Sequence, residues 1–231
     1  MIPLRDDNPV TLKPVITVGL IALCTAAFVW QLSLGVHAEA MIQALGVVPA
    51  TLFGKQPSPP EFAPLPATLT VITSMFLHGG WMHLIGNMLY LWIFGNNVED
   101  AMGHARFVVF YLLCGVAAVL AQALPAPDST IPMIGASGAI SGVLGAYLLL
   151  YPHARVLVLI PLGYFSRMLY LPAMVVLGFW FALQLLSILL ADPNQPGVAF
   201  GAHAGGFAAG ILLIPLFKRR DVRLFRARPP R

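Results

Sequence analysis

The sequence predicts an all-α membrane protein in which residues 1–231 form one polytopic domain of six transmembrane helices. Three observations favour this fold class. Hydrophobic residues make up 58% of the chain and charged residues only 10%, and the mean hydropathy of +0.83 is too high for a soluble domain of this length. Six stretches lack Asp, Glu, Lys and Arg and have about the 20 residues that a helix needs to cross a bilayer. Lys and Arg also concentrate on one side of these stretches.

The predicted spans are separated by segments that carry charges, prolines or glycines, which stop helices. In chain order the spans are residues 15–36, 79–98, 107–124, 131–151, 170–191 and 199–217. Two shorter apolar runs, about 67–77 and 156–166, are too short to cross a bilayer and are predicted to be interfacial or re-entrant. The first follows a proline-rich stretch, so residues 37–78 are expected to form one long first outer loop, partly in the membrane surface.

The distribution of basic residues predicts the orientation, because Lys and Arg are retained on the cytoplasmic side. With six spans, one side holds all of the 13 Lys and Arg residues except Lys55. Both termini are therefore predicted to be cytoplasmic, and residues 218–231 to form a basic tail that contacts anionic lipid. The pI of about 9.3 follows from this topology, so we expect a lipid bilayer and no nucleic acid as a partner.

Two features of the first span allow more than one interpretation. Ala38-Glu39-Ala40 resembles a signal-peptide cleavage site, but the apolar stretch before it exceeds the usual length of about 7–15 residues, which favours a retained span. Cys24 lies inside this span and Cys114 inside another. Both are expected to be buried packing residues and not to form a disulfide.

Polar residues in three predicted spans fall at one depth. The second, fourth and sixth spans all enter the membrane from the outer side in this topology. At 1.5 Å per helical residue, Ser137 would lie roughly 9 Å and His203 roughly 6 Å below the outer ends of their spans. His83 and Asn87 are four residues apart and share a helical face in the outer half of the second span. Because polar groups inside a membrane are costly, this cluster predicts a functional site.

Glycines indicate which of these helices pack closely, since small residues let two backbones approach. The fourth span carries a stripe of glycines beside Ser137, and the sixth carries glycines on the face of His203. The glycines assigned to close packing are Gly135, Gly138, Gly142, Gly206 and Gly210. Such packing would allow a hydrogen bond between the serine hydroxyl and the imidazole.

This set of residues permits nucleophilic acyl transfer. His203 would take the proton of Ser137, the serine oxygen would attack a peptide carbonyl, and the imidazole would protonate the departing amine. The carboxylates expected on the outer side all lie in predicted loops, so a Ser-His dyad is predicted and not a triad. The side chains of Asn87 and His83 and the backbone N–H of Ser137 are the candidate donors to the oxyanion.

Other interpretations of the same residues remain open at this point. A Gly-x-Ser-Gly string alone is weak evidence, because such residues are routine at helix contacts. It is not a hydrolase nucleophile elbow, since residue 139 is alanine. Metal binding by His78, His83 and His203 lacks a His-Glu-x-x-His motif and a nearby carboxylate, so no metal or cofactor is expected. A membrane transporter with glycine-interrupted helices is the main non-enzyme alternative.

Four ordered motifs over residues 70–217 suggest a known family. They are Phe76-Leu77-His78 with Met82-His83-Leu84-Ile85-Gly86-Asn87, then Gly95-Asn96-Asn97-Val98-Glu99-Asp100, Gly135-Ala136-Ser137-Gly138, and Ala202-His203 with Gly206 and Gly210. On these motifs the chain resembles the rhomboid intramembrane serine proteases in their compact six-span bacterial form.

The resemblance implies Ser137 as nucleophile and His203 as its base, with His83 and Asn87 lining the oxyanion site. It implies single-span membrane proteins as substrates, cleaved near the outer ends of their transmembrane helices. It also implies a multi-pass protein of the bacterial cytoplasmic membrane that needs no metal or cofactor. A non-catalytic rhomboid-like binding protein is a further alternative.

The chain departs from the family pattern in two places. Residues 37–69 lack the Trp-Arg pair of many members, and Ser141 stands where some members place an aromatic residue against the histidine ring. Another residue must therefore hold the His203 ring, and Phe200 is the expected one. By resemblance, residues 192–200 would act as a movable cap and the fifth span would gate lateral access.

Overall fold

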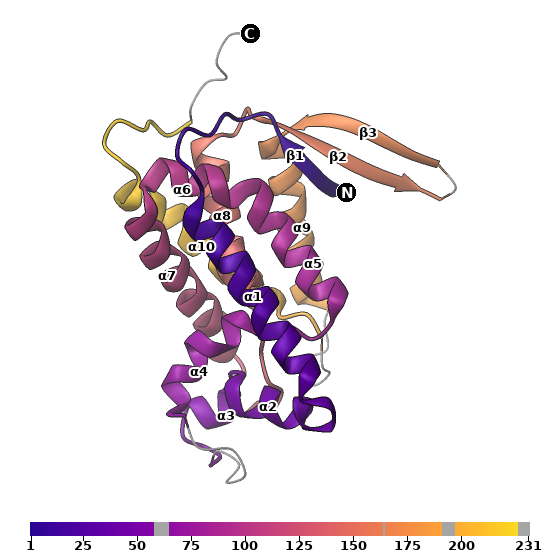
Figure 1. The fold of residues 1–231 in the computed structure, drawn as a ribbon, viewed down its shortest axis with the longest axis vertical. Coiled ribbons are helices and arrows are strands. Elements are labelled where there is room, and N and C mark those ends of the chain that lie inside the picture. Colours follow the sequence, from indigo (N-terminus) through magenta and orange to yellow (C-terminus); the bar gives the residue numbers. More distant parts are fainter. Residues whose placement is uncertain (58–64, 164, 191–196, 226–231) are drawn as a thin grey trace.

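The computed structural model describes residues 1–57, 65–163, 165–190 and 197–225, and it is a helical bundle with a small sheet at one end (Figure 1). The elements in chain order are β1 (Ile2–Asp6), α1 (Val15–Ser33), η1 (Gly35–His37), α2 (Ala38–Leu45), α3 (Pro49–Leu52), α4 (Ala67–Thr73), η2 (Ser74–Phe76), α5 (Trp81–Tyr90), η3 (Leu91–Gly95), α6 (Asn96–Met102), α7 (His104–Ala123), α8 (Ser137–Leu150), β2 (Arg155–Leu162), β3 (Phe165–Pro172), α9 (Ala173–Leu190) and α10 (Phe200–Phe217).

Four helices, α1, α7, α9 and α10, are long and apolar enough to cross a membrane, so the chain is a multi-pass membrane protein. The second predicted span is helical without interruption from α5 through the π-helical segment η3 to α6, so no one of these three elements alone has the length of a span. The fourth contains the 14-residue helix α8. The predicted count of six spans is therefore not confirmed by helix length and hydropathy among the described residues.

The fourth predicted span begins later than expected. Helix α8 starts at Ser137, and residues 131–136 are not helical. Gly135 has a φ of +123°, which ordinary residues rarely adopt, and its N–H donates to the Ser74 carbonyl at 2.9 Å. Met133 exchanges backbone hydrogen bonds with Val47. The predicted depth of Ser137 is therefore wrong, because it assumed that residues 131–136 are helical.

The all-α prediction is also wrong in one region. The run 156–166, predicted to be interfacial or re-entrant, forms strand β2 and the start of β3, and β1 completes an antiparallel sheet in the order β1-β2-β3. Val156 and Val158 alternate along β2 and are fully buried against the bundle, which is the period of a strand. The fifth predicted span begins at Ala173, because residues 170–172 belong to β3.

The predicted first outer loop is built from short helices. Helices α2, α3 and α4 lie at the end of the bundle opposite the sheet (Figure 1). The apolar run 67–77 forms α4 and η2, which are too short to cross a membrane. The proline-rich stretch falls partly on residues 58–64, the predicted cap partly on 191–196 and the basic tail partly on 226–231, all outside the described residues.

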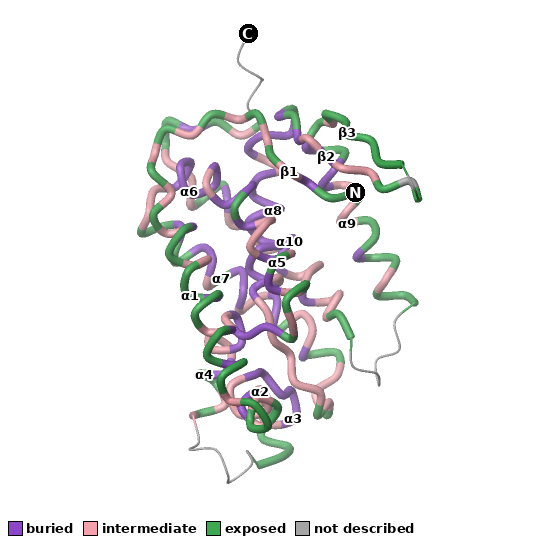
Figure 2. Tube along the Cα trace, turned by 45° about the vertical axis from the view of Figure 1, so that its right-hand side comes forward, coloured by how far each residue is buried: buried purple, intermediate pink, exposed green. Residues whose placement is uncertain are grey.

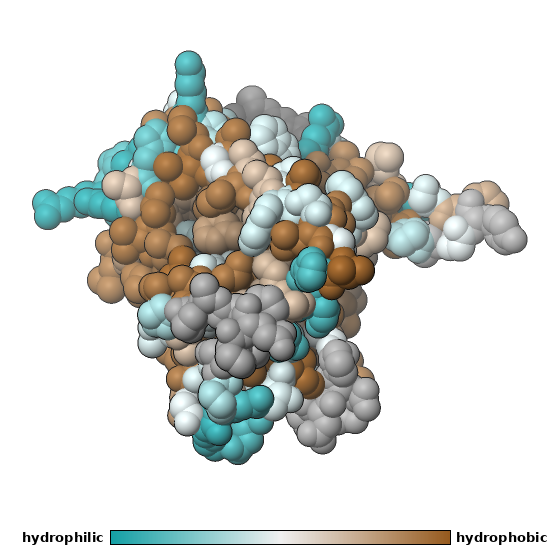
Figure 3. Space-filling model, turned by 60° about the horizontal axis from the view of Figure 1, so that its bottom comes forward, coloured by the Kyte–Doolittle hydropathy of each residue, from teal (hydrophilic) through white to brown (hydrophobic). Residues whose placement is uncertain are grey.

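Helix α8 is the centre of the bundle. Figure 2 shows α8 as largely buried, whereas α1 and α9 carry many exposed residues on the outside. Hydrophobic residues also cover much of the flank visible in Figure 3, as expected for a lipid-facing surface. Helix α8 packs on α7 and α10. Cys24 and Cys114 are free and buried, as predicted.

A buried carboxylate of α6 positions the N-terminal helix. Glu99 accepts hydrogen bonds from the backbone N–H groups of Ile16 at 2.9 Å and Thr17 at 2.8 Å and from the Thr17 hydroxyl at 2.7 Å. Oε1, the oxygen that accepts from Ile16, also lies 2.6 Å from His104 Nδ1. The first N–H groups of a helix lack partners inside the helix, and the positive end of the helix dipole favours an anion. Glu99 therefore holds the start of α1 against the bundle.

A second hydrogen bond joins the sheet to α8. The hydroxyl of Tyr147 donates to Asp6 Oδ2 at 2.6 Å, which ties β1 to the buried helix. Burial raises the pKa of the Asp6 carboxyl to about 6, although the hydrogen bond from Tyr147 acts in the opposite direction. The protonated carboxyl is therefore favoured by folding at mildly acidic pH.

Candidate active site

Ser137 and His203 meet between the first turns of two neighbouring helices. Ser137 is the first residue of α8 and His203 the fourth of α10. The serine Oγ lies 2.8 Å from His203 Nε2, which is hydrogen-bond distance. Residues that are 66 positions apart in the chain are thus brought into direct contact by the packing of α8 on α10.

Glycines make this contact possible because they let the two helix backbones touch. A Cβ atom added to Gly206 would overlap the carbonyl oxygen of Gly138, and one added to Gly210 would overlap that of Gly142. The same glycine row continues toward the sheet end of α8, where a Cβ on Gly145 would overlap the carbonyl oxygen of Phe207. Larger residues would separate the helices and with them Ser137 and His203.

A third residue orients the histidine. Oε1 of Gln184, on α9, lies 2.8 Å from His203 Nδ1, and Gln184 Nε2 donates to the Trp180 carbonyl at 3.2 Å. That second bond identifies which end of the amide is the donor, so Oε1 must accept a hydrogen bond from the Nδ1–H group of His203. A neutral imidazole that is protonated on Nδ1 has a free lone pair on Nε2. His203 can therefore accept the Ser137 proton.

Two aromatic rings pack against the imidazole. The Phe200 ring, the expected support, meets the His203 ring edge-on at a centroid distance of 6.3 Å. The Trp180 ring lies at 5.9 Å with a tilt of 33°. Sequence reasoning missed Trp180 and Gln184. The signal for Gln184 was its amide in the otherwise apolar helix α9, since a polar group inside a membrane usually has a specific partner.

His83 lies against the nucleophile loop with a donor directed toward it. The Gly79 N–H donates to His83 Nδ1 at 3.3 Å, so the proton of a neutral His83 ring is on Nε2. A Cβ atom added to Gly135 would be 2.7 Å from His83 Nε2 and 3.6 Å from Ser137 Oγ. The Nε2–H group therefore faces the space beside the serine hydroxyl, and only a glycine at position 135 leaves that space open.

Asn87 follows His83 by one helical turn. It is 7% exposed, and its Nδ2 has no hydrogen-bond partner among the described residues. A buried amide donor without a partner costs about 1–3 kcal/mol, so such groups are rare in folded proteins. Within the described ranges, Asn87 therefore has an unused amide donor one helical turn from His83.

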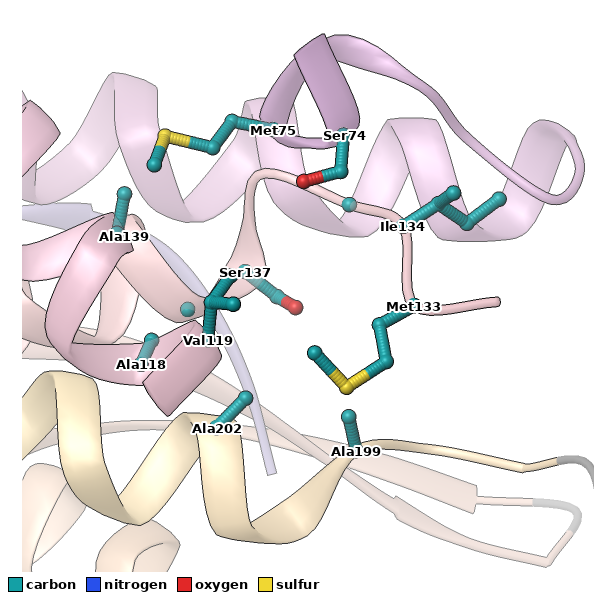
Figure 4. Close-up of a pocket in the computed structure, with 13 residues that line it drawn as sticks. Ser74, Met75, Ala118, Val119, Met133, Ile134, Ser137, Ala139, Ala199 and Ala202 are labelled. Carbon is teal, nitrogen blue, oxygen red and sulfur yellow. The ribbon is translucent and has the colours of Figure 1, made fainter. Parts of the chain in front are cut away.

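A cavity opens beside the serine. Figure 4 shows the Ser137 hydroxyl directed into a space between Met133, Ala199 and Ala202. The cavity is bordered by η2, α7, the loop before α8 and the start of α10. Its lining is mostly Ala, Gly, Met and other apolar side chains, so it fits a small apolar group. In the described ranges no three His, Cys, Asp or Glu side chains gather as they would around a metal ion.

Comparison with known proteins gives one family. A family model of the rhomboid domain matches residues 66–220. The rhomboid protease GluP of Bacillus subtilis is 34% identical over 145 residues, which is 63% of this chain and 26% of GluP. The chloroplastic rhomboid-like protein 11 of Arabidopsis thaliana is 27% identical over 164 residues, 67% of this chain and 54% of that protein.

A third relative is the rhomboid-like protease 5 of Toxoplasma gondii, which is 33% identical over 163 residues, or 68% of this chain and 17% of that protein. The chain thus spans about half of the plant relative and a smaller part of the other two proteins.

Proposed function

Because this chain belongs to the rhomboid family, we propose that it is an intramembrane serine endopeptidase whose catalytic dyad is Ser137 and His203. The observation that carries the proposal is the hydrogen-bonded series from Ser137 through His203 to Gln184. This series fits the tautomer that a general base needs, and its distances suit proton transfer from Ser137 to His203.

The reaction would proceed in two acyl-transfer steps. Ser137 Oγ attacks the substrate carbonyl carbon as His203 Nε2 takes the hydroxyl proton, and the same proton then goes to the departing amine. Water enters next and attacks the acyl carbon as His203 takes one of its protons. The imidazolium then returns that proton to Ser137 Oγ as the bond between Oγ and the acyl carbon breaks, which releases the acid and restores the serine. The imidazolium formed in each step donates a hydrogen bond from Nδ1–H to Gln184 Oε1, which stabilises the positive charge.

The tetrahedral intermediate would be stabilised from the α5 side. His83 Nε2–H and Asn87 Nδ2 supply side-chain donors, and the backbone N–H of Ser137 supplies a third at the start of α8. A helix N-terminus favours a developing negative charge. Loss of a single such donor commonly costs about 2.7–4 kcal/mol in the transition state.

The substrates that fit this site are single-span membrane proteins, cleaved near the outer ends of their helices. Helical peptide bonds have carbonyls that are already hydrogen-bonded, so the substrate must unwind before Ser137 can attack. The small apolar cavity next to the serine favours a small side chain at the cleavage site. No metal or cofactor enters this mechanism.

The topology that suits this function has six membrane crossings with both termini in the cytoplasm, in a bacterial cytoplasmic membrane. Helix α8 has 14 residues and is therefore about 21 Å long, so residues 131–136 would lie at membrane depth above it. Irregular backbone is tolerated there when it is covered by protein. The hydrogen bonds of Met133 and Gly135 to the first outer loop meet this condition.

The test is fluorophosphonate labelling of the full-length protein in detergent, followed by mass spectrometry. We expect label on Ser137, none in Ser137→Ala and only slow residual labelling in His203→Ala, whereas Ser33→Ala, which changes an exposed serine of α1, should label normally. Candidate single-span proteins are then tested for cleavage near their outer ends.

Two results would favour the alternatives. Folded protein that never labels but retains bound membrane proteins would indicate a non-catalytic rhomboid-like binder. Solute flux into vesicles that persists in Ser137→Ala would indicate a transporter.

A further inference from the structure

The hairpin of β2 and β3 extends sideways beyond the helical bundle (Figure 1). Every residue of β3 except Leu171 is exposed, including large apolar side chains such as Phe165, which is 79% exposed, and Met168, which is 63% exposed. Strand β3 is the edge of the sheet. An exposed apolar hairpin of this kind needs a partner surface.

The strand register shows which face of the hairpin points toward the membrane. Residues paired across β2 and β3 share a face. Val156 and Val158 are fully buried against the bundle, so that face is the membrane side of the sheet. The same face continues outward along the hairpin. Its outer part, which we call the distal bundle-side face, consists of Ile160, Phe165, Arg167 and Leu169. Beyond the bundle no helix covers this part of the sheet among the described residues (Figure 1).

The position along the chain places this face at a membrane surface. Strand β3 ends at Pro172, and the next residue begins α9, one of the helices able to cross a membrane. Met174 and Val175, in the first turn of α9, are exposed and apolar, as lipid-facing residues are. The hairpin therefore leaves the bundle where α9 enters the membrane. The open edge of β3 requires water or lipid headgroups as hydrogen-bond partners and could not lie in hydrocarbon.

We propose that the distal bundle-side face docks on anionic lipid headgroups of the leaflet on the sheet side. β2 and β3 carry two arginines, Arg155 and Arg167, and no acidic residue. A guanidinium such as that of Arg167 binds a lipid phosphate through paired hydrogen bonds. Phe165 and Leu169, on the same face, would enter the boundary between headgroups and acyl chains. This inference depends on the membrane topology and does not require protease activity.

The first experiment measures which face of the hairpin meets lipid. A fluorescent thiol label is attached to full-length Phe165→Cys, with Met168→Cys as the matched control on the opposite face. Both are reconstituted in phosphatidylcholine vesicles with phosphatidylglycerol and a nitroxide lipid quencher. Background labelling of the native cysteines is low because Cys24 and Cys114 are buried. We expect quenching at position 165 to be at least threefold stronger than at 168; equal quenching would overturn the proposal.

The second experiment tests the lipid charge in the Phe165→Cys protein. Arg167→Gln and Ser166→Glu each lower the net charge by one, but on opposite faces of the hairpin. One arginine near an anionic surface contributes about 1 kcal/mol. Arg167→Gln should therefore lower the ratio of lipid-docked to free hairpin, read from the quenching at position 165, about fivefold in anionic vesicles. Ser166→Glu should change it less.

Two outcomes would contradict the lipid proposal. Equal effects of the two variants, or no difference between anionic and neutral vesicles, would remove the role of Arg167. The label at position 165 could be protected from the lipid quencher at high protein density and lose this protection when the protein is diluted in the vesicles. That result would show that a second copy of the chain covers the face.

Discussion

Replacing Gln184 with leucine tests whether His203 depends on a third residue. The substitution puts an apolar side chain of similar size in place of the amide in α9 and removes the acceptor 2.8 Å from His203 Nδ1. In the ground state this bond joins two neutral groups and contributes about 0.5–1.5 kcal/mol. In the transition state the imidazole carries a positive charge, and a hydrogen bond to a charged group contributes about 1.5–3 kcal/mol. Only the difference, about 1–1.5 kcal/mol, changes the rate, so the rate should fall roughly 5- to 13-fold.

The assay is the second-order rate of fluorophosphonate labelling of Ser137 in vesicles, which needs no known substrate. Ser187→Ala, on the same helix, is the control and should label within twofold of the wild-type rate. Gln184→Leu is then combined with His203→Ala. Since Gln184 acts through the imidazole, it should have no further effect once the imidazole is absent.

Two results would refute this reasoning. Gln184→Leu that labels at the wild-type rate would show that the hydrogen bond does not matter for the base. A full additional loss in the His203→Ala background would show that Gln184 acts through stability or access and not through His203.

Three further predictions concern other parts of the molecule. Asn87→Ala should lower the labelling rate roughly tenfold to a thousandfold, because it removes one donor to the oxyanion. Gly206→Val should lower the thermal unfolding temperature and abolish labelling, since its side chain would overlap the backbone of α8. Asp6→Asn should reduce the loss of thermal stability between pH 4 and pH 7, because the raised pKa of about 6 makes ionisation of Asp6 unfavourable to folding as pH rises.

Each of these has its own control or contradictory result. An Asn87→Ala protein with unchanged labelling would remove Asn87 from the oxyanion site. Gly19→Val is the control for Gly206→Val, because a Cβ at Gly19 meets no atom within 4 Å; equal destabilisation by both would contradict close packing. For Asp6, an unchanged pH profile in the asparagine variant would assign the pH dependence to other groups.

Local sequence patterns were sufficient for several features of the protein. Hydropathy over a window of span length depends only on residues near one another in the chain, so the sequence predicted the helices α1, α7, α9 and α10. The motifs around Ser137 and His203 indicated the family. The glycines of the fourth and sixth spans were recognisable because helical spacing alone determines which residues share a face.

Hydropathy failed where an apolar run was too short for a span. A buried strand and a short buried helix have the same composition, so the run 156–166 was not recognised as β2. Its strand character depends on pairing with Ile2–Asp6 and with β3, which lie elsewhere in the chain. The start of α8 at Ser137 likewise depends on contacts of Met133 and Gly135 with the first outer loop.

The sequence by itself therefore determined which segments are apolar enough for a membrane and which side chains could perform acyl transfer. Only the tertiary structure decided that Gln184 bonds to His203 Nδ1, that Trp180 packs on the imidazole and that Nδ2 of Asn87 is buried without a partner. The physical reason is that periodicity fixes the face of a helix on which a residue lies, whereas the rotation and depth of neighbouring helices depend on packing between distant segments.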